Sequence, residues 1–382
     1  MENRKRILFV TSRNFQILGG IERYVDNFIK HYSPKETNLI FLVPNTALGR
    51  IRRNAGIQYM GYDLPFRVFN NFLRFLNPLL SIGTMRRDIR RKIKEIRPDL
   101  IWTNDYDSVL AAAGSCPVYF MPGSLLKMDL MFDYCFGGSY FYRLSRWLQM
   151  QIKVMLERTA FKVCQRVIVF SQAFKDRIVR HCHVPADKVM LVPVGIDLLD
   201  APPSVPIEKG TILSVSRLAK SKNIDLALAA LRHLDGYRLL IAGDGQERKS
   251  LVAKIQEYGL TERVRLLGHK ENVAELYQRC EIFIHLSRYE NFGLVLLEAM
   301  LFGKSPIVLR PELPGVHTAS AEIVRDGYNG FFVDDDAVAI ARKIKEVAAL
   351  NRETLAEHCQ DFARQFSFEQ HITKLFDLLQ RS

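Results

Sequence analysis

Cysteine is scarce in this chain. Six cysteines are spread over 382 residues, and no two of them form a Cys-x-x-Cys pair. Such spacing excludes a dense disulfide framework and gives no indication of a zinc site. The six are Cys116, Cys135, Cys164, Cys182, Cys280 and Cys359. We therefore expect a protein of a reducing, cytoplasmic compartment.

Long apolar runs are also missing. No stretch approaches the roughly 18 consecutive apolar residues that a membrane-spanning helix needs. The basic start of the chain, MENRKRILFVTSRN, contains only the apolar run Ile7–Val10, which is too short for a signal peptide. With 48% hydrophobic and 25% charged residues, the composition excludes a disordered chain and indicates a soluble globular protein of two or three domains.

Acidic residues are few in the first half of the chain. Residues 1–195 hold 30 lysines and arginines against 15 aspartates and glutamates, a balance of +15. Residues 196–382 hold the remaining 24 against 26, a balance of −2. The excess positive charge predicts an anionic partner for the first half, which could be nucleic acid, a phosphorylated substrate or an anionic membrane surface.

Short apolar runs alternate with helical patterns along the whole chain, which predicts an α/β fold with parallel sheets. The expected strands of the first half are Arg6–Val10, Leu39–Val43, Leu100–Thr103, Val118–Met121 and Val167–Phe170. A proline-rich connector (APPSVP, 201–206) follows, and the alternation then restarts. The expected strands of the second half are Thr211–Val215, Arg238–Ala242, Val264–Leu267, Ile282–His285 and Pro306–Leu309. We predict two doubly wound, Rossmann-like domains, 1–195 and 196–365, and a final amphipathic helix within 366–382.

Two loops carry glycines or cations at places where such sheets bind ligands. Gly19-Gly20 lies between the first strand and a helix expected over 21–32, where backbone amides can approach a phosphate. A tight turn without a ligand explains these two glycines equally well. The segment 216–223 (SRLAKSKN) follows the first strand of the second domain, so Arg217 and Lys222 could clamp a diphosphate. Lys220 fits a solvated loop better.

The segment 290–298 (ENFGLVLLE) is the most specific of the motifs. It follows the expected strand Ile282–His285 and opens a helix at Gly293, whose neighbouring amides could bind phosphate. Glu290 and Glu298 are eight residues apart and therefore lie on nearly the same helical face. Two such carboxylates could hold sugar hydroxyls at both ends of a nucleotide sugar. The structural alternative is a capped helix with a buried, paired Glu298.

Taken together, these motifs resemble those of the retaining GT-B glycosyltransferases of family 4. The matching elements are E-x7-E with F-G-L inside it, S-R-L-x-x-x-K-N, I-A-G-D-G, L-G-H, V-P-V-G-I-D and G-G-I-E at 19–22. The resemblance is nearly continuous over 165–335, whereas the N-terminal half matches only at its first loop and in its strand pattern. It implies two Rossmann-like domains that face each other across a cleft, with the C-terminal helix crossing back to the N-terminal domain.

The resemblance implies a role for each matching residue and a nucleotide-diphosphate sugar as donor, with no cofactor and no metal. Glu290, Arg217 and Lys222 would be catalytic: Glu290 would bind the transferred sugar, and the two cations would neutralise the diphosphate. Glu298 would bind the ribose, and the backbone at 268–269 would face the base. The donor-binding set is Gly19, Gly20, Arg217, Lys222, Gly268, His269, Glu290, Phe292, Gly293, Leu294, Val295 and Glu298.

The chain departs from the family at one position. Many members carry a histidine after the fourth strand of the first domain, where this chain has Pro122, and no histidine occurs between His31 and His181. Asp105 and Ser124 are candidates for the acceptor side, and the sugar, the base and the acceptor stay open. The segment 105–107 (DYD) resembles the metal-binding D-x-D of other glycosyltransferases, but we expect a surface loop there.

Two aromatic stretches in the basic half suggest an interface. In 64–80, apolar residues that include Phe66, Phe69 and Phe72 recur at helical spacing, and the basic run 86–97 follows. This combination is typical of proteins that lie on anionic membranes, although a helix packed on the sheet with a solvated basic face is the alternative. The aromatic-rich stretch 128–147 is expected to form an acceptor-side loop and helix.

We therefore predict a retaining, metal-independent glycosyltransferase on the inner face of the cytoplasmic membrane. It would transfer a sugar from a UDP- or GDP-sugar to a lipid-linked or oligosaccharide acceptor in lipopolysaccharide, capsule or exopolysaccharide synthesis. The alternatives are a transferase with a soluble small acceptor, a nucleotide-sugar epimerase, an inactive scaffold and a basic nucleic-acid-binding protein. Nucleic acid is not the expected partner, because it leaves the paired glutamates unexplained.

Overall fold

A computed structural model gives the fold of the chain. It describes residues 5–12, 20–33, 37–49, 51, 53–63, 76–126, 140–197, 205–270 and 272–380. The chain forms two compact units: unit 1 comprises 1–194 and 368–382, and unit 2 comprises 195–367. None of the helices within the described residues is long and apolar enough to cross a membrane.

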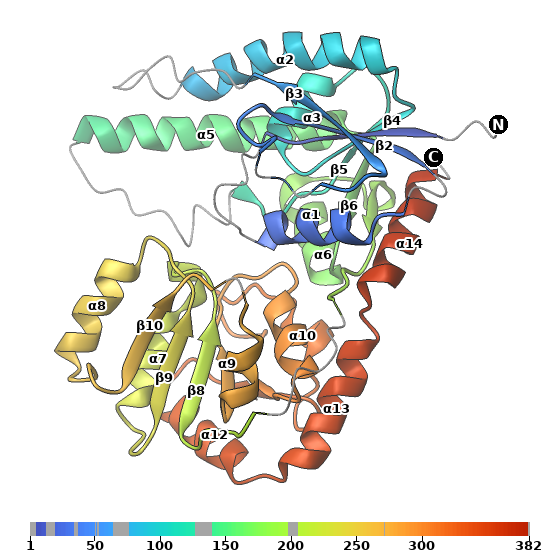
Figure 1. Cartoon of the computed structure of the whole chain (residues 1–382). Coiled ribbons are helices and arrows are strands. Elements are labelled where there is room, and N and C mark those ends of the chain that lie inside the picture. Colours follow the sequence, from blue (N-terminus) through green and yellow to red (C-terminus); the bar gives the residue numbers. More distant parts are fainter. Residues whose placement is uncertain are drawn as a thin grey trace. The chain divides into compact units, whose positions relative to one another are not determined.

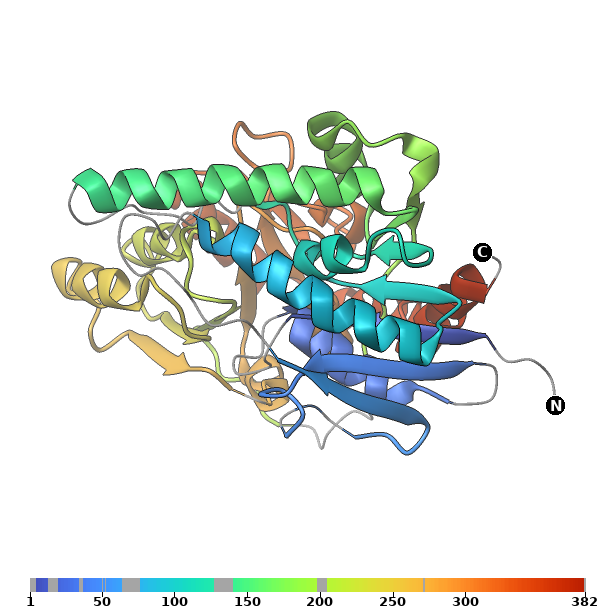
Figure 2. The same cartoon turned by 90° about the horizontal axis from the view of Figure 1, so that it is seen from above.

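Unit 1 is built on a seven-stranded sheet in the order β3-β2-β1-β4-β5-β6-β7 (Figure 1). Its strands, all paired in parallel, are β1 (Arg6–Val10), β2 (Asn38–Pro44), β3 (Ile57–Tyr62), β4 (Leu100–Thr103), β5 (Val118–Phe120), β6 (Arg166–Val169) and β7 (Val189–Leu191). Its helices are α1 (Gly20–His31), α2 (Asn77–Ile96), α3 (Tyr106–Ala112), α5 (Tyr140–Val163), α6 (Gln172–Cys182), the 3₁₀ turn η2 (Ala186–Lys188) and α14 (Phe368–Gln380). The helices α2, α3 and α5 cover one face of the sheet (Figures 1 and 2), whereas α1, α6 and α14 lie on the other.

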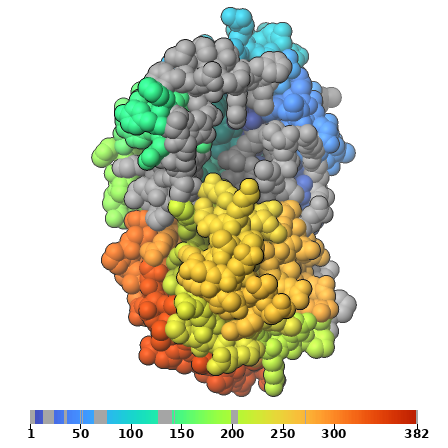
Figure 3. Space-filling model, turned by 90° about the vertical axis from the view of Figure 1, so that its left-hand side faces the viewer, coloured from blue at the N-terminus to red at the C-terminus, as the bar shows by residue number. Residues whose placement is uncertain are grey.

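Unit 2 has a six-stranded parallel sheet in the order β10-β9-β8-β11-β12-β13. Its strands are β8 (Thr211–Val215), β9 (Arg238–Ala242), β10 (Val264–Gly268), β11 (Ile282–His285), β12 (Pro306–Leu309) and β13 (Phe331–Val333). Its helices are η3 (Lys220–Lys222), α7 (Ile224–Leu231), α8 (Arg248–Glu257), α9 (Ala274–Arg279), α10 (Leu294–Leu301), α11 (Ser320–Ile323), α12 (Ala337–Ala348) and α13 (Arg352–Arg364). The yellow residues of Figure 3, which include α8, cover one face of this unit.

The two cores explain why these short apolar runs become parallel strands. All residues of β4, β8, β11 and β12 are buried, which is the pattern of strands covered by helices on both faces. Unit 1 packs an aromatic cluster of Phe9, Phe28, Phe41 and Trp102 across β1, β2, β4 and α1. The core of unit 2 is mainly aliphatic, with a smaller aromatic group of Tyr277, Phe283 and Phe302.

The predicted fold class, two doubly wound Rossmann-like units, is confirmed. The predicted strands all form, with ends shifted by a residue or two, but the sequence patterns missed β3, β7 and β13. These three strands lie at or beside the sheet edges, where β3 and β7 are only partly buried and lack a continuous apolar run. The helix expected near the end of the chain is α14, and it packs on α1 within unit 1.

Candidate active site

The candidate site of unit 2 lies where the strand order of its sheet reverses. From β8 the chain winds outward in one direction through β9 and β10, and in the other through β11, β12 and β13. In open α/β sheets, ligands bind beyond the carboxyl ends of the two strands that flank this switch point. The loops after β8 and β11 hold the motifs 216–223 and 290–298. The fold therefore brings together two motifs that are about seventy residues apart in the sequence.

Close backbone packing holds the loop after β8 in place. A Cβ atom on Gly243 would lie 1.9 Å from the carbonyl oxygen of Ser216, and one on Gly245 would lie 2.4 Å from that of Leu218. Only glycine fits at these two positions. On the other side, the Ser221 carbonyl accepts hydrogen bonds from the Arg288 amide (2.8 Å) and the Ser287 hydroxyl (3.2 Å). The loop after β8 is thus held on one side by close contact with the loop at 243–245 and on the other by hydrogen bonds from Ser287 and Arg288.

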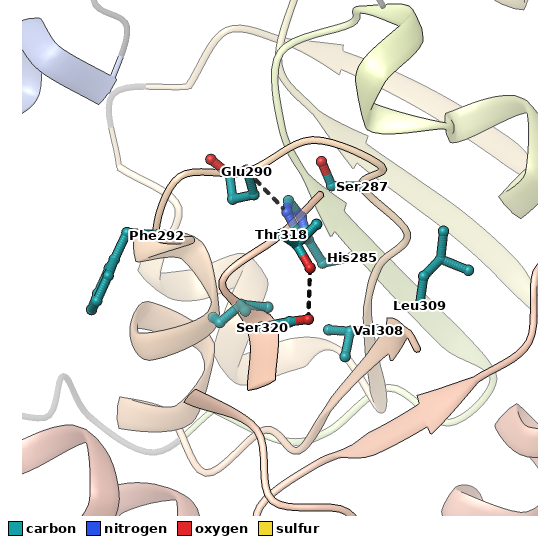
Figure 4. Close-up of a pocket in the computed structure, with 9 residues that line it drawn as sticks. His285, Ser287, Glu290, Phe292, Val308, Leu309, Thr318 and Ser320 are labelled. Atoms are coloured by element: carbon teal, nitrogen blue, oxygen red, sulfur yellow. Dashed lines mark hydrogen bonds and ion pairs between the residues drawn. The ribbon is translucent and has the colours of Figure 1, made fainter. Parts of the chain in front are cut away.

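Lys222, Glu290 and His285 form the polar centre of the site. The Lys222 ammonium donates to Glu290 Oε2 at 2.5 Å and lies 3.4 Å from the Tyr289 carbonyl. His285 Nε2 is 3.3 Å from the same carboxylate oxygen, as the dashed line in Figure 4 shows. The Glu290 amide donates to the carbonyl of His317 at 3.1 Å. A single carboxylate oxygen is therefore held by a cation and an imidazole.

Burial and charge act in opposite directions on this cluster. Burial raises the pKa of Glu290, but Lys222 and the hydrogen bond from His285 outweigh it and hold that pKa well below its usual range. Burial lowers the pKa of His285, and the attraction of Glu290 only partly offsets this effect. Near neutral pH the cluster therefore contains an ionised carboxylate, an ammonium and a neutral imidazole, which is 5% exposed.

The start of α10 adjoins these charges. Gly293 adopts φ 101° directly before the helix, and as a glycine it has no side chain with which to cap the first amides of α10. Gly293 lies against the Glu290 side chain, because a Cβ added to it would be 3.5 Å from Glu290 Cγ. The Phe292 side chain is buried and packs on Phe366, with ring centroids 6.0 Å apart. Within 292–295 the backbone amides are therefore the groups that could bind phosphate, and that they do so stays a prediction.

A small cavity opens beside the polar centre (Figure 4). It is lined by His285, Ser287, Glu290, Phe292, Leu296, Val308, Leu309, Thr318 and Ser320. The hydroxyls of Thr318 and Ser320 are 2.8 Å apart. The wall is therefore polar toward Glu290 and apolar toward the end of β12.

The other predicted donor residues of unit 2 lie on α10 and just after or at the ends of β8 and β10. The Glu298 carboxylate accepts a hydrogen bond of 3.1 Å from the hydroxyl of Tyr277 on α9, and its side chain is half-buried. Gly268 adopts φ 72° at the end of β10, and its carbonyl accepts from the Gly243 amide at 2.8 Å. His269 follows it at the surface, and Arg217 is exposed directly after β8.

In unit 1 the structure corrects one expectation. The segment 105–107 is not a surface loop: Asp105 is the N-cap of α3, and its carboxylate accepts from the amides of Ser108 and Ser12, both at 2.8 Å. An aspartate followed three residues later by a free helix amide is a favourable cap, which is why the chain turns helical here. Ser124 is half-buried after β5, Gly20 begins α1, and Gly19 lies outside the described residues.

His285 is the residue of this cluster that sequence reasoning did not single out. Its position as the last residue of a buried strand, five residues before Glu290, was the available signal. Among the residues that the structure describes, no three His, Cys, Asp or Glu side chains come close enough together to hold a metal ion.

Comparison with known proteins supports the family. The model for glycosyl transferases group 1 matches residues 199–366, and the model for glycosyltransferase family 4 matches residues 18–199. A GalNAc-α-(1→4)-GalNAc-α-(1→3)-diNAcBac-PP-undecaprenol α-1,4-N-acetyl-D-galactosaminyltransferase of Campylobacter jejuni is 28% identical over 57% of this chain and 60% of its own length. The lipopolysaccharide core biosynthesis glycosyltransferase LpsE of Rhizobium meliloti is 31% identical over 45% of this chain and 48% of its own. The match thus spans only about half the length of these relatives.

Solved structures agree on the fold. The crystal structure of HepE from Anabaena, in complex with UDP and glucose, superposes with a TM-score of 0.73 at 19% identity, covering 99% of this chain and 100% of that one. At this identity the likeness establishes the fold. With both family models matched in order along the chain, this protein belongs to the family 4 glycosyltransferases of the GT-B fold.

Proposed function

We propose that this protein transfers a sugar from a nucleotide-diphosphate sugar, with retention of configuration and without a metal, to a lipid-linked or oligosaccharide acceptor of cell-surface polysaccharide synthesis. The observation that carries the proposal is the contact of Lys222 with Glu290 beside the start of α10, where the N-cap residue is Gly293. It combines a cation, a carboxylate and backbone amides at the switch point of the sheet.

These groups match the charges of the reaction. The diphosphate leaving group gains negative charge as its bond to the sugar breaks, and Lys222, Arg217 and the first amides of α10 can stabilise that charge. Glu290 stays ionised because its pKa is depressed, so it only accepts hydrogen bonds and suits the hydroxyls of the transferred sugar. In a retaining transfer, the acceptor oxygen bonds to the anomeric carbon on the face that the diphosphate leaves.

The relatives favour a donor and an acceptor class. HepE was crystallised with UDP and glucose, and the Campylobacter jejuni relative is named for an undecaprenol-diphosphate-linked glycan. LpsE is named for lipopolysaccharide core synthesis. A UDP-sugar as donor and a lipid-linked glycan as acceptor are consistent with both sets of relatives, while a GDP-sugar remains the other donor to test.

A lipid-linked acceptor would also explain the excess of positive charge in unit 1. On α2, Met85, Ile89 and Ile93 face the core, whereas Arg86, Arg87, Arg91 and Lys94 are exposed. The cyan residues of α2 protrude from the surface in Figure 3.

Exposed aromatic side chains add to this basic surface. At the start of α5, Tyr140 and Phe141 are 74% and 69% exposed. We propose that this surface adsorbs to the anionic inner face of the cytoplasmic membrane. The aromatic residues at 64–75 and 128–139 that suggested this interface lie outside the described residues.

Calorimetry with UDP, GDP and their sugars tests the donor site. We expect one nucleotide to bind to the unmodified protein, and the Glu290→Gln variant to retain nucleotide binding but to lose transfer from the matching sugar. Transfer is measured to an undecaprenol-diphosphate glycan and, in parallel, to a soluble oligosaccharide. Absence of binding for both nucleotides would contradict the proposal, and RNA binding in its place would favour the nucleic-acid alternative.

Metal independence has a separate test. Because Lys222, Arg217 and helix amides can stabilise the leaving diphosphate, we expect turnover to survive an excess of EDTA. Loss of turnover in EDTA that manganese or magnesium restores would show instead that a metal takes part.

A further inference from the structure

Unit 1 has a switch point of its own, between β1 and β4. From β1 the strand order runs to β2 and β3 on one side, and from β4 to β5, β6 and β7 on the other. The carboxyl ends of β1 and β4 lie side by side, since Val10 pairs with Thr103. The residues that follow are Ser12 on one strand and Asn104 on the other. By the rule that locates ligands in such sheets, this is the second place to look for one.

Asp105 does not serve a ligand there, because its carboxylate is used by the fold. One oxygen accepts from the Ser108 amide and caps α3, and the other accepts from the Ser12 amide and ties the two loops together. Asn104 and Asp107 lie on either side of this cap. Unlike Asp105, they have buried polar atoms without a hydrogen-bond partner among the described residues.

Asn104 has a buried amide side chain. Its side chain is only 2% exposed, and neither its amide nitrogen nor its amide oxygen has a partner among the described residues. A buried polar group without a partner is costly, so native proteins rarely keep one without a role. An amide offers two donors and one acceptor, which suits a ligand group that can both accept and donate.

Asp107 is a second residue with an unsatisfied polar atom among the described residues. Its Oδ1 is closed off from solvent and has no hydrogen-bond partner among the described residues. The charged groups that act on it are Asp105 and Lys153. The charges of Asp107, Asp105 and Asp88 all raise the pKa of the buried Tyr62 hydroxyl. The carboxylates of Asp107 and Asp105 against the one ammonium of Lys153 disfavour a phosphate or a carboxylate ligand. The same surroundings accept uncharged hydroxyl groups.

We propose that Asn104 and Asp107 form a binding site for the hydroxyls of an uncharged sugar at the β1/β4 switch point. A sugar hydroxyl both donates and accepts, so it can satisfy the Asn104 amide and donate to Asp107 Oδ1. In identifying this sugar as the glycan end of the acceptor, the inference rests on the proposed function. An anionic carrier or membrane would then be bound elsewhere, by the basic surface of α2.

The test uses neutral methyl glycosides as probes of the full-length protein. Saturation-transfer NMR is recorded with millimolar methyl glucoside, methyl galactoside and methyl N-acetylglucosaminide, in the presence of UDP. We expect at least one glycoside to bind, and Asn104→Leu and Asp107→Leu each to weaken its binding by about tenfold, because one hydrogen-bond partner is lost. The affinity for UDP should not change, since the UDP site lies in unit 2.

Thermal unfolding separates a ligand-binding role from a structural one. Asn104→Leu should unfold at the same temperature as the unmodified protein or higher, since an unsatisfied polar group is replaced by an apolar one of similar size. The control Asp105→Ala should unfold at a lower temperature, because it loses a helix cap. Failure of all glycosides to bind, undiminished binding by both variants, or a lower unfolding temperature for Asn104→Leu would overturn the site. If the glycosides bind but UDP itself does not, the donor proposal alone is contradicted.

Discussion

At the scale of single residues, Lys222 has two tasks. It forms an ion pair with the Glu290 carboxylate, which also contacts the neutral imidazole of His285. Without Lys222, a half-buried negative charge would remain without its ion-pair partner, which is strongly destabilising when the partner is removed alone. The same ammonium is the candidate ligand of the donor diphosphate. Removing this ammonium should therefore weaken nucleotide binding and lower the free energy of unfolding.

Replacing Lys222 by alanine should weaken UDP binding by about 1.5–3 kcal/mol, the usual range for a charge-assisted hydrogen bond. We also expect a lower free energy of unfolding for this variant, but a folded protein. Calorimetry and denaturant titration measure the two effects. Lys220→Ala is the matched control, because Lys220 is exposed in the same loop and should change neither quantity appreciably. Unchanged UDP affinity in Lys222→Ala would remove the diphosphate clamp.

Asp107 should make the stability of unit 1 depend on pH. Burial, aided by the charge of Asp105 and opposed by Lys153, raises its pKa from 3.8 to about 7. Between these values the folded protein keeps a proton that the unfolded chain has lost, so this residue costs stability as the pH rises. Asp107→Asn removes that cost. We expect its gain in unfolding temperature over the unmodified protein to be larger at pH 8 than at pH 5, and an equal gain at both would contradict the assignment.

At the scale of elements, α14 is fastened to unit 1 through a buried histidine. His371 Nδ1 donates to the Pro193 carbonyl at 2.8 Å, so Nε2 must accept from the Tyr24 hydroxyl of α1 at 2.7 Å. Phe368, Leu375 and Phe376 bury the apolar face of the helix. The last residues of the chain thus complete the core that its first residues begin.

Replacing His371 by leucine should lower the free energy of unfolding by about 2–3 kcal/mol, since two buried hydrogen-bond partners are left unsatisfied. Burial lowers the pKa of His371 from 6.5 to about 4. Its contribution is therefore complete above pH 6.5 and decreases as the pH falls toward 4, by up to about 3 kcal/mol. Denaturant titrations at pH 7 and pH 4.5 should show this loss in the unmodified protein but not in His371→Leu. Thr373→Ala, on the exposed face of α14, is the control.

At the scale of the whole molecule, charge is divided between the two halves of the chain. The balance is +15 over 1–195 and −2 over 196–382. The structure refines which cations on α2 are available to a partner. Arg90 is half-buried and donates to the Ala113 carbonyl at 2.7 Å, so it supports the packing of α2 on α3. Arg86, Arg87, Arg91 and Lys94 are exposed instead.

Changing Arg86, Arg87, Arg91 and Lys94 together to glutamine should release the protein from phosphatidylglycerol vesicles, since each basic residue near an anionic surface contributes about 1 kcal/mol. Cosedimentation at low salt measures this, and adsorption should weaken with added salt, which screens charges beyond about 10 Å at 0.1 M. UDP binding should be retained. The control variant changes four exposed cations of unit 2, Lys249, Arg265, Arg342 and Lys345. If the unmodified protein does not sediment with the vesicles, the membrane proposal is wrong.

Much of this protein could be predicted from its sequence, because the signals are local. A parallel strand covered on both faces reads as a short apolar run, and each run was found where its burial is complete. In the segments 216–223 and 290–298, the residue types and their spacing within a few positions predict a site for a nucleotide-diphosphate sugar. Since both follow strands of one doubly wound sheet, the order of the strands alone places them on the same edge.

Only the tertiary structure decided what depends on neighbours far apart in the chain. Asp105 and Asp107 look alike in the sequence, yet one caps a helix and accepts from the Ser12 amide. The other is desolvated, and one of its oxygens has no hydrogen-bond partner in the part of the chain that the structure describes. His285 becomes part of the site through Glu290 and Lys222, which sits on another strand's loop. Burial and hydrogen bonding are set by every element that packs around a side chain, so no local pattern in the sequence contains them.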